Sequence, residues 1–185
     1  LLSRRQRQMC IRDSYYNVPL WSRQHFDIMK PLMQQLANAG QKVITASVMH
    51  HPWAGQTEDP FDSMVFRMKK IDGSWVYDYT VFDRWVEFMM SLGIDCQINC
   101  YTLVPWALKF DYYDQATNRI RFVEAKPGEA AYEDYWFSFL KDFAGHLRQK
   151  GWFEKTTIAM DEREKSMMQK AFDLIFRADA GYKVS

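Results

Sequence analysis

Two adjacent carboxylates, Asp161 and Glu162, are the residues in this sequence whose types and spacing best suit catalysis. They follow a short β-branched run, so a buried strand would deliver both to its carboxyl end. Cleavage of a glycosidic bond needs one group that protonates the leaving oxygen and another that stabilises positive charge. The pair therefore predicts a glycoside-cleaving site, and position alone leaves open the alternative of a solvated turn or helix start.

The geometry of a strand sets a condition on this pair. Neighbouring strand residues point to opposite faces of the sheet, so both carboxylates reach one substrate only if the strand ends before them. The polar run 161–165 favours such an ending. We therefore expect the strand to stop ahead of Asp161.

Two further loops after predicted strands carry side chains that suit sugar recognition. Flat aromatic rings cover the apolar faces of pyranoses, and amide, imidazole and phenol groups bind hydroxyls. A loop pinned by its own polar groups, or core packing under a hairpin, is the alternative. The candidates for substrate contact are His51, Trp53, Gln56 and Tyr101, with Trp106 as a subsite wall.

No metal or cofactor site is predicted. His50 and His51 are adjacent, but no third ligand lies at a convincing spacing. The sequence has no nucleophile elbow, phosphate-binding glycine loop or dinucleotide fingerprint. Cys96 and Cys100 fall in one predicted strand about 13 Å apart, too far for a disulfide, and we expect both to be buried.

The elements that must position these residues alternate between strands and helices. Apolar periodicity predicts three buried strands, each followed by a helix, with hairpins inserted after the first two strands. This pattern predicts an α/β fold, a partial (β/α)8 TIM-type barrel of about three βα units with β-hairpin insertions at the active rim. The expected strands are 42–48, 95–101 and 156–160, the helices 24–39, 80–92, 130–150 and 168–176, and the hairpins 64–80 and 110–124.

Each predicted helix carries an apolar stripe that we expect to be buried. The stripes are Phe26, Met29, Leu32, Met33 and Leu36 in the first helix; Val81, Trp85, Phe88, Met89 and Leu92 in the second; Tyr132, Trp136, Phe139, Leu140, Phe143 and Leu147 in the third; and Met168, Ala171, Phe172, Ile175 and Phe176 in the fourth.

The first 14 residues differ from the rest of the chain. Residues 1–14 hold four Arg and one Asp, a net charge of +3, whereas the whole chain carries only +1. They lack apolar periodicity and a signal-peptide core, and they resemble translated sequencing-adapter read-through, so we expect them to be non-native. A basic arm that binds nucleic acid or a partner is the alternative.

Residues 15–185 are expected to be part of a catalytic barrel that is truncated at both ends. A full barrel needs about 250 residues and eight strands, and the chain stops where a fourth strand should begin. We therefore expect the 185-residue chain by itself to be inactive. The net charge of +1 and the absence of a run of about 18 apolar residues indicate neither a nucleic-acid partner nor a membrane span.

Five separated runs of the sequence carry a family resemblance. They are His51–Thr57, Tyr77–Asp83, Phe88–Ile94, Gln97–Tyr101 and Thr157–Arg163. Together they span about residues 17–183 and resemble glycoside hydrolase family 123, covering part of that family's catalytic barrel.

The resemblance implies a retaining β-N-acetylgalactosaminidase that acts on glycosphingolipid-type glycans with a terminal 2-acetamido sugar and needs no cofactor. In such enzymes the 2-acetamido oxygen of the substrate is the nucleophile. Glu162 would then be the acid/base, its pKa raised by apolar walls and by the neighbouring charge. Asp161 would stay ionised, orient the acetamido N–H and stabilise an oxazolinium intermediate.

The resemblance also implies export to the periplasm or cell surface of a bacterium. A non-catalytic carbohydrate-binding protein that keeps the aromatic rim is the alternative function. A structural or partner-binding domain is a third hypothesis.

Overall fold

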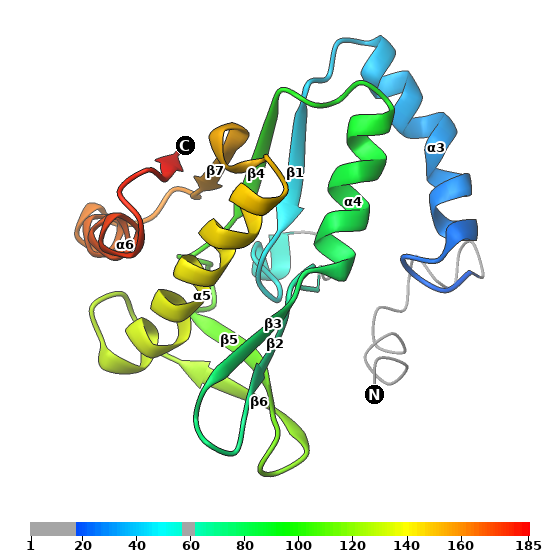
Figure 1. The fold of residues 1–185 in the computed structure, drawn as a ribbon. Coiled ribbons are helices and arrows are strands. Elements are labelled where there is room, and N and C mark those ends of the chain that lie inside the picture. Colours follow the sequence, from blue (N-terminus) through cyan, green and yellow to red (C-terminus); the bar gives the residue numbers. More distant parts are fainter. Residues whose placement is uncertain (1–17, 57–61) are drawn as a thin grey trace.

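The computed structural model describes residues 18–56 and 62–185, and these residues have an α/β fold (Figure 1). The expectations about residues 1–14 lie outside the described residues. Within the described ranges, the strands form two four-stranded sheets. No helix in these ranges is both long and apolar enough to cross a membrane.

The first sheet has the strand order β1-β4-β7-β8, and every neighbouring pair is parallel. Ile44, Ile98 and Ile158 lie on one face of this sheet and are each 0% exposed, whereas Thr45 and Asn99 on the opposite face are exposed or only partly buried. The predicted α/β fold with a parallel sheet is therefore confirmed, while closure into a barrel stays a prediction. Its strands are β1 (Val43–Ser47), β4 (Gln97–Tyr101), β7 (Thr156–Ala159) and β8 (Lys183–Val184).

Strand β8 is the fourth strand, which was expected to begin where the chain stops. It covers only Lys183–Val184 and pairs with Thr157 and Ile158 of β7. Two residues with one polar side chain carry no periodicity, so the strand could be placed only by counting βα units.

The second sheet joins the two predicted hairpins. β2 (Phe66–Lys69) pairs with β3 (Trp75–Asp78), β5 (Lys109–Asp114) pairs with β6 (Arg119–Glu124), and both pairs are antiparallel. A short parallel pairing of β2 with β5 links them into one sheet. Figure 1 shows this sheet beyond the carboxyl ends of β1 and β4, on the side where these strands point.

Helix α5 (Ala130–Gln149) forms the centre of the core as predicted. All six residues of its predicted stripe are 0% exposed. The hydroxyl of Tyr132 donates to the carbonyl of Leu103 (2.8 Å), and that of Tyr135 donates to the carbonyl of Asp111 (2.9 Å). The helix therefore fixes both the loop after β4 and the start of the second hairpin.

The stripe predicted for helix α4 (Thr80–Ser91) is buried at Met89 and Leu92 but not at its first two positions. Phe82 and Val86 are 0% exposed, whereas Val81 and Trp85 are only partly buried. The indole N–H of Trp85 donates to the carbonyl of Thr45 (2.9 Å), so its ring lies across the edge of β1 rather than in the core.

The burial predicted for helix α3 (Arg23–Asn38) is wrong at two positions. Leu32 and Leu36 are 49% and 48% exposed. The helix packs on α4 through Phe26, whose ring centroid lies 4.9 Å from that of Phe88, and the side that carries the two leucines faces outward.

Two further burial predictions are wrong. On helix α6 (Lys165–Ala178), Phe176 is 43% exposed, and Leu174 takes an inward position that the predicted stripe omitted. Cys96 is exposed because β4 begins only at the next residue, whereas Cys100 is buried as predicted.

Candidate active site

Asp161 and Glu162 lie just beyond β7, which has already ended at Ala159. The N–H of Met160 donates to the carbonyl of Ser185 (3.0 Å), and this bond holds the start of the loop beside β8. Because both carboxylates follow the last strand residue, the condition set by alternating strand faces is met. The prediction that the strand stops ahead of Asp161 is confirmed.

Asp161 carries a buried hydrogen-bond acceptor. Its Oδ2 is buried and has no hydrogen-bond partner within the described part of the chain. Burial raises the pKa of Asp161, the Arg163 guanidinium opposes this rise, and the Glu162 carboxylate adds to it. A buried acceptor without a donor is costly, so its position favours a donor that arrives with a ligand.

Glu162 is exposed, whereas the predicted acid role called for apolar walls around it. The burial expected for Glu162 is therefore wrong, because the polar loop between β7 and α6 leaves its side chain at the surface. The buried member of the pair is Asp161.

Trp53 and Tyr101 come together although they lie in different loops. Their ring centroids are 5.4 Å apart, with an interplanar angle of 48°. The contact follows from the β1–β4 register, which places Ser47 beside Tyr101, and from the Val48 N–H, which donates to the Tyr101 carbonyl (2.7 Å). Two of the four predicted sugar contacts therefore form one aromatic surface.

A second contact links this aromatic pair to the carboxylates. The hydroxyl of Thr102, the residue after Tyr101, donates to the sulfur of Met160 (3.6 Å). Met160 directly precedes Asp161, so the ends of β4 and β7 meet here. Because β1, β4 and β7 pair in parallel, their carboxyl ends lie at the same edge of the sheet.

Arg163 is a site residue that sequence reasoning missed. Its guanidinium lies 4.7 Å from the ring centroid of Trp106, a cation–π contact, and its Nε is buried without a partner in the described residues. Trp106 is 43% exposed and keeps a free ring face at the rim. Only the position of Arg163 next to the acidic pair could have indicated its role.

His51 and Gln56 are less clearly placed for substrate contact. His51 adopts a left-handed backbone (φ 50°) and stacks on His50, with 3.8 Å between the ring centroids. Burial and the neighbouring His50 lower the pKa of His51. Gln56 ends the short 3-10 helix η1 (Ala54–Gln56) and is exposed. Thr57, the last residue of the run His51–Thr57, lies outside the described residues.

A cluster of metal-ligating side chains lies in the same region. One ligand atom each from His50, Asp62 and Asp111 falls within 4.8 Å of the others. The Nδ1 of His50 and Oδ1 of Asp62 are 2.7 Å apart. The third ligand that spacing in the sequence did not provide is supplied by β5, which is distant in the chain.

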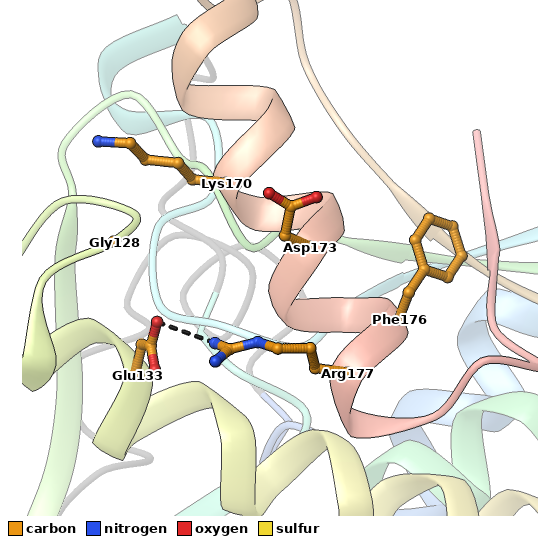
Figure 2. Close-up of a pocket in the computed structure, with 6 residues that line it drawn as sticks. All are labelled: Gly128, Glu133, Lys170, Asp173, Phe176 and Arg177. Carbon is orange, nitrogen blue, oxygen red and sulfur yellow. Dashed lines mark ion pairs between the residues drawn. The ribbon is translucent and has the colours of Figure 1, made fainter.

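Figure 2 shows a separate crevice between the start of α5 and the outer side of α6. Charged groups line it, including an ion pair between Arg177 and Glu133 (2.8 Å). Its lining contains none of the predicted site residues. The crevice is therefore distinct from the carboxylate pair.

Comparisons with known proteins give the chain a family context. The model of the glycoside hydrolase 123 catalytic domain matches residues 6–185. A solved structure of a family 123 glycoside hydrolase from Clostridium perfringens, described in terms of glycolipid glycan hydrolysis, superposes with a TM-score of 0.84 and 30% sequence identity. The match covers 97% of this chain and 32% of that one. No curated protein sequence matches the chain.

Proposed function

The chain belongs to glycoside hydrolase family 123, and from this premise we propose that its site removes terminal β-linked N-acetylgalactosamine from glycans with retention of configuration. Because the chain spans about a third of the Clostridium protein, the proposal concerns the whole protein that carries these residues. The observation that carries it is the Asp161–Glu162 pair at the end of β7, together with the buried Oδ2 of Asp161, which has no hydrogen-bond partner among residues 18–56 and 62–185.

The proposed reaction is substrate-assisted. The acetamido oxygen of the sugar attacks its own anomeric carbon while Glu162 donates a proton to the glycosidic oxygen, and the bond to the leaving group breaks. The product of this step is a cyclic oxazolinium ion. Water then attacks the anomeric carbon and gives its proton to Glu162, while the bond from that carbon to the acetamido oxygen breaks. The acid and the acetamido group are restored, and the two successive inversions retain the configuration.

Asp161 is proposed to act on the acetamido group. Its Oδ2 accepts the acetamido N–H, and the negative charge balances the positive charge that develops on the oxazolinium ring. This role supplies the donor that Oδ2 lacks. Glu162, which is exposed, acquires its apolar surroundings from the sugar itself.

The aromatic pair is proposed to hold the sugar. Trp53 offers a ring face for stacking, and Tyr101, in contact with it, offers a hydroxyl for the acetamido group. His51 and Gln56 remain proposed hydroxyl contacts from the same loop. The relative from Clostridium perfringens is described in terms of glycolipid glycans, and we propose the same substrate class for this chain.

The acetamido group provides a direct test. We expect an aryl β-N-acetylgalactosaminide to be hydrolysed at least about 10³-fold faster than the matched aryl β-galactoside, which lacks the internal nucleophile. Rates are compared as kcat/KM, and the first-formed anomer is identified by NMR. Equal rates, or release of the α-anomer first, would contradict the proposal.

A non-catalytic carbohydrate-binding protein is the second candidate, and the exposure of Glu162 favours it. This alternative predicts saturable binding of N-acetylgalactosamine without turnover of the aryl substrate. The two functions are therefore separated by the same pair of measurements.

Replacing Arg163 with Gln should move the acidic limb of the pH–rate profile to higher pH. The guanidinium lowers the pKa of Asp161, so its removal raises that pKa and protonates the carboxylate at a higher pH. The profile of kcat/KM against pH measures the shift. Arg177→Gln, on α6 and paired with Glu133, is the matched control and should leave the limb in place.

A further inference from the structure

We propose that His50, Asp62 and Asp111 form a binding site for a divalent transition-metal ion. One ligand atom from each residue lies within 4.8 Å of the other two, and His50 Nδ1 lies 2.7 Å from Asp62 Oδ1. The site uses none of the proposed catalytic or sugar-binding residues, so the inference does not depend on the proposed function.

Three segments that are distant in the sequence build the cluster. His50 lies in the loop after β1, Asp62 precedes β2, and Asp111 belongs to β5. The backbone of Asp111 is fixed because its carbonyl accepts the hydroxyl of Tyr135 (2.9 Å). The ligands are therefore brought together by the parallel β2–β5 pairing and by α5, and are not a chance gathering on one loop.

The charge and burial of the cluster favour a cation. Asp111 is only 4% exposed, and the side chains of His50 and Asp62 are 28% and 21% exposed. Two carboxylates supply anionic oxygens that can bind a cation, and their partial burial strengthens that attraction.

The donor set indicates the class of metal. One imidazole and two carboxylates form a mixed N/O set that suits zinc and its transition-metal neighbours better than calcium or magnesium, which prefer oxygen alone. Metal–ligand bonds of about 2.0–2.2 Å require the donor atoms to approach within roughly 3.5 Å. The present limit of 4.8 Å between donor atoms is wider than this, so metal binding requires the side chains to move closer together, and three protein ligands leave a fourth position for water.

A bound cation would tie the first loop to the second sheet. The loop that contains His50 also contains Trp53, whose ring contacts Tyr101. Coordination to Asp111 would therefore fix the aromatic surface relative to β5. The metal-free alternative is that His50 and Asp62 are joined by their hydrogen bond alone.

The proposal departs from the prediction of no metal site. That prediction rested on His50 and His51 as the ligand pair, with no third ligand nearby in the sequence. In the structure, His51 stacks on His50, and the additional ligands come from other segments.

The site is tested by calorimetric titration of Zn²⁺ into the metal-stripped, full-length protein that contains these residues. We expect one Zn²⁺ per chain, and a loss of affinity of at least about tenfold in Asp62→Asn and in Asp111→Asn. Asp134→Asn, an exposed carboxylate on α5 paired with Lys69, is the matched control and should bind as the wild type does.

Asp62→Asn keeps the test decisive if Asp111→Asn, with its buried side chain, fails to fold. Asp62 is partly exposed, so Asp62→Asn should melt cooperatively without metal, and only the wild type should gain thermal stability when Zn²⁺ is added. Absence of saturable Zn²⁺ binding, unchanged affinity in Asp62→Asn, or binding of Ca²⁺ alone would each overturn the proposal.

Discussion

Replacing Glu162 with Gln should lower kcat for glycoside hydrolysis by about 10²- to 10⁴-fold while sugar binding persists. Gln has nearly the same size but cannot donate a proton to the leaving oxygen or accept one from water. Because Glu162 is exposed, the change removes no core contact and should leave the fold intact. Steady-state kinetics with an alkyl β-N-acetylgalactosaminide and calorimetric binding of N-acetylgalactosamine measure the two effects.

The leaving group distinguishes an acid from a residue that merely shapes the site. An aryl substrate with a strongly activated leaving group needs no protonation, so Glu162→Gln should slow its cleavage much less than that of an alkyl glycoside. Glu164→Gln, two residues further along the same loop, is the matched control and should retain full activity. Unchanged turnover of the alkyl glycoside in Glu162→Gln would remove the catalytic assignment.

Features that depend on one strand and its neighbouring loop could be predicted from the sequence. The short runs that end before Val48, Thr102 and Met160 predicted the strands β1, β4 and β7, and the run of polar residues after Met160 placed the end of β7 before Asp161. The hairpin around Asp72 was predictable for the same reason. The side chain of Asp72 accepts the N–H and the hydroxyl of Ser74 (2.9 and 2.6 Å).

Features that depend on pairing between distant segments could not be predicted. The parallel contact of β2 with β5 joins two hairpins, and no local pattern specifies it. This contact brings Asp62 and Asp111 near His50, which is why spacing along the chain gave no third ligand. The apolar stripe of α3 likewise gave a hydrophobic face without indicating what covers it, and Leu32 and Leu36 are half exposed.

In the acidic pair, the more buried member is Asp161 and not the predicted Glu162. The family resemblance implied an ionised Asp161 and apolar walls around Glu162. In the structure the burial falls on Asp161, whose pKa is raised, and an ionised Asp161 is therefore less stable in the folded chain than in water. The Asp161 carboxylate therefore lowers the stability of the folded chain, but its negative charge lies where it would balance the oxazolinium ion.

Replacing Asp161 with Asn should therefore lower activity and raise stability at neutral pH. Loss of the charge should reduce kcat by about 10²- to 10³-fold, because the developing positive charge is no longer balanced. Stability should rise by less than about 1 kcal/mol, a small gain because the side chain remains partly exposed. Kinetics and thermal melts of wild type and variant measure the two changes.

The pH dependence fixes the sign of the stability effect. A folded-state pKa above the unfolded value means that the folded chain binds more protons between the two values, so wild-type stability falls as pH rises through them. Asp161→Asn has no group that titrates at this position, so it does not lose this stability as the pH rises. The variant should be more stable than the wild type at pH 7, and the difference should vanish below the ordinary pKa of aspartate, where residue 161 is neutral in both proteins.

Asp173→Asn, exposed on α6, is the control and should change neither activity nor melting temperature. A variant at Asp161 that is less stable than the wild type at pH 7 would show that the carboxylate is stabilised by the fold, and that its buried oxygen has a donor within the protein.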